Sequence, residues 1–432
     1  MPGSDRMMRV IRFPHHGYTI VTVSSYQGEV KKAFLSHWIY HVYTRGGTGE
    51  HASLKEFTVK KADGRHKRIV MSAWGLTGSG KSTHGLYVID DRIAARFAKF
   101  FGVNPLDFVS EQVVRNDDIV SVFEDRVYSP EKGSWTKTEG VDENQLAMYR
   151  AGTSPRALHE NTEWDESGNV CFDGKLFQYK GFLNQNARSV FMLEDTGFFD
   201  GSVDSSEPLN FAVFITPSYL ADYAWVKLND PSFAAKVLAD GRTTVHPAQS
   251  LENVGAEKYA SRYCLPFTIG IDNSDHVHRF HGFLHDRWGS DNPIDVFLIN
   301  TTGRVGTKYE WAETARGGDT VSLPRTVFEE RDGKRKPVGG ASPSIEETEL
   351  FLYQAARGAV EYEPHPIWGD KVLTPVKVPG LDDSRLKELN PFSHRSVEEM
   401  RKILHAQIEN SKYYLSTQCA GLDEGIRDAM DF

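Results

Sequence analysis

The sequence predicts an α/β fold, because short apolar segments typical of β-strands occur between segments that carry helix-capping signals. The strand candidates are residues 18–24, 68–74, Val190–Leu193, Phe211–Thr216 and Asp295–Asn300. Ser344 with Glu347 forms a capping box ahead of a helix that runs to about Ala356, and Ser396 with Glu399 forms a second one. The second helix is expected to place four apolar residues on one face, Val397, Met400, Leu404 and Ile408.

Composition excludes several classes of protein. The 432 residues suggest about two or three domains, and 39% hydrophobic residues exclude an intrinsically disordered chain. The net charge of -9 repels phosphate polymers, so we expect no nucleic-acid partner. The three cysteines (Cys171, Cys264, Cys419) are far apart, which indicates neither a disulfide framework nor a cysteine zinc site. No apolar run reaches the roughly 20 residues that span a bilayer, so we expect a cytoplasmic protein with no membrane partner.

The segment from Gly303 to Ser342 differs from the rest of the chain. It is rich in Gly, Arg, Lys, Glu and Pro and contains the basic run GKRKP. We interpret it as an inserted, solvated loop, with a binding lid as the alternative.

A glycine-rich loop follows the strand predicted at 68–74. Its residues are Gly75, Leu76, Thr77, Gly78, Ser79, Gly80, Lys81, Ser82 and Thr83, and they contain the pattern GxxxxGK[ST]. In this pattern backbone N–H groups converge on phosphate oxygens, the lysine adds a positive charge and the serine hydroxyl can ligate Mg²⁺. The sequence therefore predicts a P-loop that binds a nucleotide.

Such a loop needs an acidic partner for the metal, and two aspartate pairs compete for this role. Asp90 and Asp91 lie within a few residues of the loop, whereas Asp117 and Asp118 lie further on, before a strand-like stretch. The residues around Asp117 and Asp118 favour the second pair as the acidic partner of the metal.

Several ordered motifs together resemble the ATP-dependent phosphoenolpyruvate carboxykinase family. That family carries YxGExKK, a histidine, GLSGTGKTT and an Asp-Asp pair; here the matching stretches are YQGEVKK from Tyr26, then His51, GLTGSGKST and NDD from Asn116. SPEKGSWTKT is similar to the family's FEGGCYAKT, and LNQNAR is similar to LTENTR. DVFLINTTG, HPIWG and KELNP resemble its C-terminal half. The resemblance implies a carboxykinase-like P-loop fold with mixed sheets.

The resemblance also implies two metal sites. Lys32, His51 and Asp118 would bind Mn²⁺, and Ser82 with Asp117 would hold the Mg²⁺ that accompanies ATP. A lysine can act as a ligand only when it is neutral, so we expect its pKa to be lowered by the adjacent Lys31 and by the metal.

The remaining roles concern the substrates. Lys81 and Lys137 would neutralise the charge on the transferring phosphoryl group. Tyr26, Lys31 and Arg188 would contact the acceptor, with Arg188 suited to bidentate pairing with a carboxylate. Three further residues align with family positions: Glu131 with a glutamate of the family's FEGGCYAKT stretch, and Glu160 and Thr348 with nucleotide contacts.

The sequence departs from the family in three places. Only 25 residues precede Tyr26, so we expect residues 1–50 to be a remnant of the family's N-terminal domain and residues 51–432 to form the catalytic domain. A longer stretch after Lys81 predicts an inserted helix from about Asp90 to Gly102. The adenine-clamping segment is replaced by GGASPSIEET, which leaves the base preference open and allows the 303–342 segment to take over the base contact.

These features predict phosphoryl transfer between ATP, or another nucleoside triphosphate, and a small carboxylate-bearing acceptor. The family's reaction converts ATP and oxaloacetate into phosphoenolpyruvate, CO₂ and ADP. The alternatives are a kinase reaction on another small molecule and a catalytically silent nucleotide-binding module.

A second metal hypothesis rests on four histidines between His276 and His285. On a helix His281 and His285 would share one face and could bind Zn²⁺ as part of a hydrolase. No glutamate completes an HExxH pattern, so we favour a packing or surface role for this run.

Overall fold

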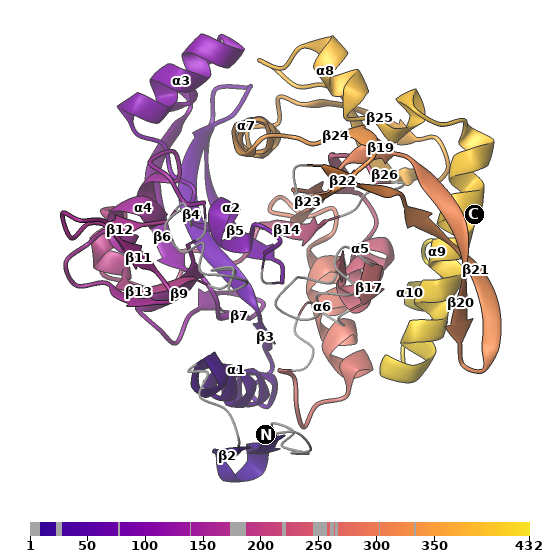
Figure 1. The fold of residues 1–432 in the computed structure, drawn as a ribbon, viewed down its shortest axis with the longest axis horizontal. Coiled ribbons are helices and arrows are strands. Elements are labelled where there is room, and N and C mark those ends of the chain that lie inside the picture. The colour runs from indigo at the N-terminus through magenta and orange to yellow at the C-terminus, as the bar shows by residue number, and fades with distance from the viewer. Residues whose placement is uncertain are drawn as a thin grey trace.

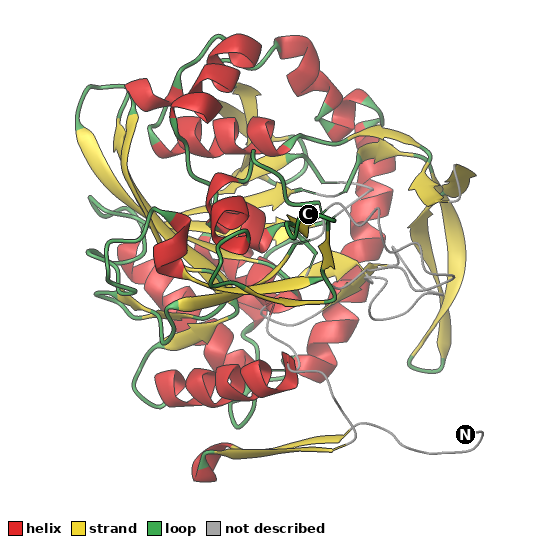
Figure 2. Ribbon diagram, turned by 60° about the vertical axis from the view of Figure 1, so that its left-hand side comes forward, coloured by secondary structure: helices red, strands yellow, loops and turns green. Residues whose placement is uncertain are grey.

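The computed structural model describes residues 9–22, 28–76, 78–138, 140–172, 187–217, 222–244, 257–259, 263, 267–301, 303–331 and 334–432. Helices cover both faces of one large β-sheet, which confirms the predicted α/β class (Figures 1 and 2).

The large sheet is mixed. Its eight strands lie in the order β25 (Glu361–His365), β26 (Gly369–Lys377), β15 (Trp225–Leu228), β18 (Asp295–Asn300), β14 (Phe211–Thr216), β5 (His66–Trp74), β4 (Ala52–Lys60) and β6 (Val109–Asn116). β14 pairs in parallel with both β5 and β18, and the other pairs are antiparallel. The carboxyl ends of β5, β14 and β18 therefore meet at one edge, where α/β folds place their ligands.

Two hydrophobic clusters form the core, one on each face of the sheet. Phe97 and Leu350 bring α3 and α7 onto one face, and Phe233 and Phe280 bring α5 and α6 onto the other. The helices are α1 (Gly28–Tyr43), α2 (Lys81–Gly85), α3 (Asp91–Phe101), α4 (Leu146–Gly152), α5 (Pro231–Asp240), α6 (Asn273–Arg287), α7 (Ile345–Ala356), α8 (Asp383–Glu388), α9 (Val397–Gln418) and α10 (Glu424–Arg427).

Smaller sheets surround this framework. Two of them contribute to the site: one contains β3 (Thr48–Glu50), β7 (Val120–Val122) and β8 (Val127–Tyr128), and the other contains β10 (Leu158–Glu160), β13 (Arg188–Met192) and β9 (Gly133–Lys137). The remaining pairs in these outer parts are β1 (Arg9–Phe13) with β2 (Tyr18–Thr22), β11 (Glu163–Trp164) with β12 (Val170–Cys171), and β16 (Arg242–Thr244) with β17 (Glu257–Tyr259).

The strand predictions are confirmed with small shifts. β14 and β18 have the expected bounds, and β5 begins two residues before the expected segment. The segment predicted at 190–193 is β13, which ends at Met192, and Leu193 begins a 3₁₀ turn. The segment predicted at 18–24 is β2, which ends at Thr22; residues 23–24 lie outside the described residues.

The helix predictions are confirmed apart from one residue. Ser344 and Glu347 make both bonds of a capping box on α7, and Ser396 caps α9. The inserted helix is α3, with Asp90 as its N-cap. Val397 is 42% exposed, unlike the buried Met400, so its expected place on the apolar face was wrong: it lies in the first turn of α9, before the packed part of the helix.

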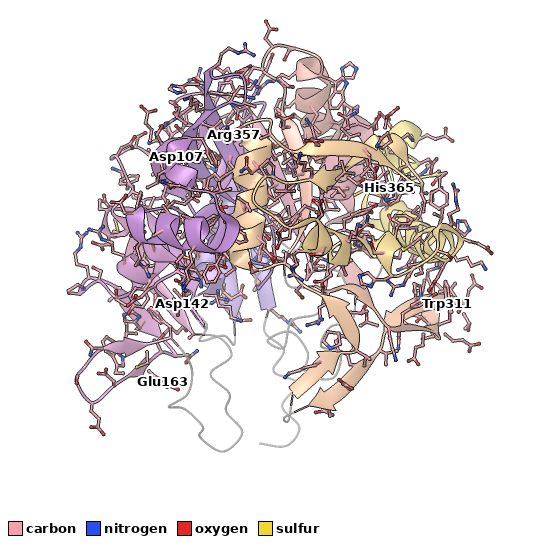
Figure 3. All side chains as sticks on the ribbon, turned by 90° about the horizontal axis from the view of Figure 1, so that it is seen from above. Asp107, Asp142, Glu163, Trp311, Arg357 and His365 are labelled. Atoms are coloured by element: carbon pink, nitrogen blue, oxygen red, sulfur yellow. The ribbon has the colours of Figure 1, made fainter. Side chains whose placement is uncertain are left out.

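The segment 303–342 is not an irregular loop, and that interpretation is corrected. Its described residues form three antiparallel pairs: β19 (Val305–Thr307) with β24 (Gly339–Ala341), β20 (Tyr309–Arg316) with β21 (Asp319–Thr326), and β22 (Phe328–Arg331) with β23 (Lys334–Pro337). Gly317 and Gly318 have positive φ at the turn of the long β20–β21 hairpin, which packs on α9. Trp311 on this hairpin and Glu163 lie on opposite sides of the molecule (Figure 3).

The β1–β2 hairpin projects from the main body beside α1 (Figure 2). A hydrogen bond of 3.0 Å between Thr19 and His37 fastens it to that helix. Among the residues that the structure describes, no helix combines the length and apolar character needed to cross a membrane.

Candidate functional site

The glycine-rich loop joins the carboxyl end of β5 to α2, as the sequence predicts. Gly80 has a φ of 92°, which favours glycine, and a Cβ there would lie 3.4 Å from both the His84 ring and the Thr301 hydroxyl. Gly85 is confined further, because a Cβ would lie 1.9 Å from Ser53 Oγ. The close contact between α2 and β4 therefore requires glycine at position 85.

A cavity of about 350 Å³ opens beside this loop. Twelve of the residues expected at the site line it: Lys31, Lys32, His51, Leu76, Gly78, Gly80, Lys81, Ser82, Thr83, Asp118, Lys137 and Arg188. Gly75 and Ser79 belong to the same loop, and the Ser79 hydroxyl donates to Leu76 O within it. Tyr26 and Thr77 lie outside the described residues.

The second aspartate pair, and not the first, lies beside the loop. Asn116 ends β6, and its Oδ1 accepts hydrogen bonds from the backbone of Asp118 at 2.7 Å and of Ile119 at 2.9 Å. This turn presents Asp117 and Asp118 to the loop, whereas Asp90 accepts from Ile93 N as a helix cap. The second pair, which the sequence favours, is therefore the pair that lies within reach of the loop.

Asp118 is the centre of a cluster of basic side chains from three parts of the chain. Its Oδ2 lies 3.1 Å from Lys31 Nζ and 2.9 Å from Lys32 Nζ, both on α1. Its Oδ1 lies 3.1 Å from Lys81 Nζ and 2.8 Å from His51 Nε2. The pairing of β3 with β7 brings His51 to this position. His51 directly follows β3, and Asp118 lies two residues before β7.

The protonation states in this cluster follow from burial and charge. Burial favours a higher pKa for Asp118, but Lys31, Lys32 and Lys81 outweigh it and hold the pKa well below its usual value. Burial lowers the pKa of Lys32 more than Asp118 raises it, and Lys31 lowers it further. Burial and Lys32 lower the pKa of His51 to about 4, so this ring is neutral at pH 7. The expected depression at Lys32 is therefore present, with burial as its first cause.

The donor set of Lys32, His51 and Asp118 fits a metal ion. Lys32 Nζ lies 3.0 Å from His51 Nε2 and 2.9 Å from Asp118 Oδ2, and His51 Nε2 lies 2.8 Å from the other carboxylate oxygen, Asp118 Oδ1. Adjacent ligands of an octahedral ion at 2.0–2.1 Å are about 2.9 Å apart.

The hydrogen bonds of the His51 ring support the same conclusion. His51 Nδ1 lies 3.3 Å from the Tyr263 carbonyl and Nε2 faces Asp118, so both ring nitrogens face acceptors. A neutral ring carries one proton and cannot donate to both. A cation beside Nε2 removes this conflict. In this structure the ammonium group of Lys32 is that cation.

Ser82 and Asp117 form a second candidate metal position. Ser82 Oγ lies 3.1 Å from Asp117 Oδ2, which also accepts at 2.6 Å from the hydroxyls of Ser134 and Thr136 on β9. Asp117 Oδ1 is buried without a hydrogen bond, and its nearest cation, Lys81 Nζ, is 3.8 Å away. A loop hydroxyl beside a carboxylate with an unsatisfied oxygen suits Mg²⁺.

Three charged residues lie in one row across the β10–β13–β9 sheet. Arg188 is opposite Lys137 on one side and opposite Glu160 on the other. Burial and the Arg188 charge lower the pKa of Lys137 to about 8. Glu160 is next to Arg188 and does not line the cavity. Glu131 reaches the cluster from another side, 3.2 Å from Lys31.

Thr348 does not take the expected place. Its buried hydroxyl accepts a hydrogen bond of 3.2 Å from the Trp225 indole in the core. Ile345 on the same helix lines the cavity instead.

Sequence reasoning missed the polar groups that orient Asp117 and the apolar end of the cavity. Ser134 and Thr136 alternate with Trp135 and Lys137 along β9, so the period of two could have identified them. The missed residues that line the cavity are Gly28, Trp135, Gly140, Val141, Gln145, Met148 and Ile345, which come from distant segments without a shared motif.

The histidine run lies on α6, as the zinc hypothesis required, but its members are divided among different partners. His276 contacts Glu50, His278 contacts Asp423 and His281 contacts Ser232. No group of three or more His, Cys, Asp and Glu side chains in the described ranges could hold a metal. The packing or surface interpretation is therefore favoured.

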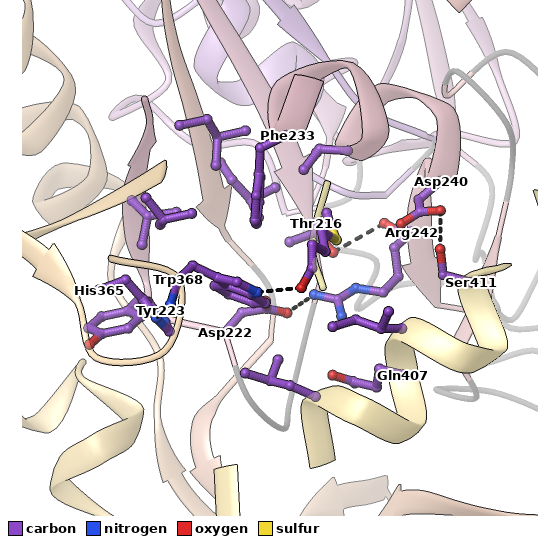
Figure 4. Close-up of a pocket in the computed structure, with 18 of the residues that line it drawn as sticks. Thr216, Asp222, Tyr223, Phe233, Asp240, Arg242, His365, Trp368, Gln407 and Ser411 are labelled. Carbon is purple, nitrogen blue, oxygen red and sulfur yellow. Dashed lines mark hydrogen bonds and ion pairs between the residues drawn. The ribbon is translucent and has the colours of Figure 1, made fainter. Parts of the chain in front are cut away.

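A second cavity, of about 70 Å³, lies between α5, α9 and β15 (Figure 4). It is lined mainly by apolar and aromatic side chains such as Phe233 and Leu404. None of its described lining residues is a lysine, and its Arg242 pairs with Asp222. This cavity is therefore poorly suited to phosphate.

The larger cavity has the opposite character. Five basic side chains and one carboxylate are found among its described lining residues: Lys31, Lys32, Lys81, Lys137, Arg188 and Asp118. A chain with a net charge of -9 thus concentrates positive charge at the glycine-rich loop. Such a cavity attracts anions that carry several charges.

A family model described as phosphoenolpyruvate carboxykinase matches residues 5–216. This range contains every described residue that lines the larger cavity except Ile345. A search among curated proteins found no match.

Proposed function

Through residues 5–216 the chain belongs to the ATP-dependent phosphoenolpyruvate carboxykinase family, and on this basis we propose that it transfers a phosphoryl group between ATP, or another nucleoside triphosphate, and a small carboxylate-bearing acceptor. The observation that carries this proposal is the convergence of Lys31, Lys32 and Lys81 on Asp118 in one cationic cavity. Binding of a nucleotide alone requires the glycine-rich loop but not a histidine and two lysines from the N-terminal part of the chain.

The nucleotide phosphates would bind at the loop. Backbone N–H groups of residues 78–82 would donate to phosphate oxygens, and Lys81 would neutralise the charge on the transferring group. Lys137 would face the same phosphates from β9. Phosphoryl transfer depends chiefly on such positioning and electrostatic stabilisation.

Two metal ions would complete the site. Lys32, His51 and Asp118 would hold Mn²⁺, and Ser82 with Asp117 would hold Mg²⁺. Bound divalent ions polarise oxygen atoms and offset developing negative charge. The low pKa of His51 supports this assignment, because a neutral imidazole is the form that ligates metals.

The acceptor would occupy the end of the cavity between α1 and β13. Arg188 would pair with its carboxylate through two parallel N–H···O bonds, and Lys31 would add a second positive charge. Oxaloacetate is the acceptor that the family description suggests. In that reaction the bond to one carboxylate breaks, CO₂ leaves, and the remaining enolate oxygen accepts the phosphoryl group from ATP.

The test is ³¹P NMR of the purified protein with ATP, Mg²⁺ and Mn²⁺, with and without oxaloacetate. We expect a phosphoenolpyruvate signal that Lys81→Ala and His51→Ala abolish and that Lys402→Ala, on the exposed face of α9, retains. Consumption of ATP without oxaloacetate would be hydrolysis, with water as the phosphoryl acceptor, and would direct the search to another small-molecule acceptor. Bound but intact ATP under every metal and acceptor combination would contradict the proposal and indicate a silent nucleotide-binding module.

A further inference from the structure

Glu349 on α7 is a fully buried carboxylate that lies behind the glycine-rich loop. Its Oε1 is 2.8 Å from His84 Nδ1, and its Oε2 is 3.3 Å from Lys55 Nζ on β4. A buried carboxylate persists only when its oxygens are paired in this way.

His84 connects Glu349 to the loop. It belongs to α2, and its ring lies 3.4 Å from the position of a Cβ on Gly80. Thr301 also borders Gly80, and its hydroxyl donates to Ser79 O. The last turn of the loop is therefore packed against the His84 ring and bonded to Thr301.

The hydrogen bond fixes the orientation of this ring. A carboxylate can only accept, so His84 Nδ1 must carry the proton that it donates to Glu349. The ring plane is thereby set by a residue on a different helix. The same helix reaches the cavity through Ile345, which lies one turn before Glu349.

We propose that Glu349 is a positioning residue for phosphate binding: by orienting His84 it holds the glycine-rich loop in the shape that receives the phosphates. This proposal rests on the proposed function, because it assumes that the loop binds a nucleotide. α7 thus contacts both ends of the cavity. Ile345 lines its apolar end, and Glu349 contacts His84 behind the glycine-rich loop.

The test compares two buried glutamates. In Glu349→Gln the amide faces either His84 or Lys55 with an N–H group, so one hydrogen bond is lost. Glu56→Gln is the matched control, because Glu56 is also fully buried and pairs with Arg68 and Arg115, none of which lines the cavity. Both variants are expected to lower the thermal unfolding temperature.

Calorimetric titration with ATP and with inorganic tripolyphosphate, well below the unfolding temperature, separates a positioning role from a structural one. We expect Glu349→Gln to raise Kd for both anions by about tenfold, the lower end of what losing an orienting partner costs at metal sites. KM for ATP should rise while kcat changes little, and Glu56→Gln should leave both Kd values unchanged. Adding Glu349→Gln to His84→Ala should weaken binding no further, because both changes remove the same interaction.

The failures of the two proposals differ. Wild-type affinity in Glu349→Gln, or an equal loss in Glu56→Gln, overturns the positioning role alone. Failure of the unmodified protein to bind either anion overturns the proposed function and this inference together.

Discussion

His51 Nε2 lies 2.8 Å from Asp118 Oδ1, and these two atoms repel each other when the neutral ring carries its proton on Nδ1, toward the Tyr263 carbonyl, unless a cation lies beside them. The low pKa of His51, about 4, keeps the ring neutral at pH 7, so the pair is arranged to share positive charge from Lys32 or from a metal ion.

His51→Asn is expected to weaken Mn²⁺ binding by at least about 100-fold, because the variant removes one of three ligand atoms. Titration of Mn²⁺ followed by electron paramagnetic resonance measures this affinity. His285→Asn on α6, an exposed histidine beside Asp286, should bind Mn²⁺ as the unmodified protein does. Equal Mn²⁺ affinity in both variants would contradict the assignment.

Lys81→Ala is expected to reduce kcat/KM for ATP by about 10²–10³-fold, as removal of one preorganised charge does in other enzymes. Lys81→Arg should be nearly as impaired, since Lys81 Nζ donates to Asp117 O and also contacts Asp118, a geometry that a planar guanidinium cannot reproduce. Steady-state assays of nucleotide consumption check both variants. Activity that survives Lys81→Ala would place the reaction elsewhere.

ATP affinity is expected to fall as the pH rises above about 8. The pKa of Lys137 is lowered from 10.5 to about 8, so its positive charge is present below this pH and is lost above it, before ordinary lysines lose theirs. ATP carries its full charge in this range and binds the protonated lysine better. Lys137→Arg should remain charged and bind ATP with a flat profile between pH 7.5 and 9.5. A profile in Lys137→Arg as steep as that of the unmodified protein would show that another group titrates.

Two glycines provide a test of packing around the loop. In Gly85→Ala the new Cβ would lie 1.9 Å from Ser53 Oγ, so we expect a loss of about 1–3 kcal/mol in the free energy of unfolding. In Gly282→Ala, on α6, the Cβ meets nothing within 4 Å, and a gain of up to about 1 kcal/mol is expected from helix propensity. Denaturant unfolding measures both. Equal stability of the two variants would show that α2 moves freely against β4.

Parts of this fold were predictable because they obey local rules. β14 and β18 are apolar except at their ends, where Thr216, Asp295 and Asn300 lie, since a strand covered on both faces has few interior polar positions, and their bounds could be predicted. β4 could not be predicted in this way. It contains Lys55 and Glu56 and is nevertheless buried, because their charges are paired with Glu349 and Arg115, which are distant in sequence.

The site shows the same division. Lys81 and Asp117 follow from motif spacing, and the structure brings them together. Thr348 does not lie where the resemblance places it, because the direction in which a side chain points depends on how its helix packs against Trp225, and no motif encodes that. The segment 303–342 was interpreted from its composition, although alternating exposure along β20 and the two glycines at the turn are typical of a hairpin.

The fastening of the β1–β2 hairpin to α1 has a practical consequence. α1 carries Lys31 and Lys32 in its first turns and holds the hairpin through the Thr19–His37 bond near its middle. A purification tag or fusion partner attached ahead of the hairpin would pull on the same helix that supplies two amino groups to Asp118. Protein for enzymology should therefore carry its tag after Phe432, whose ring contacts Arg401 on α9.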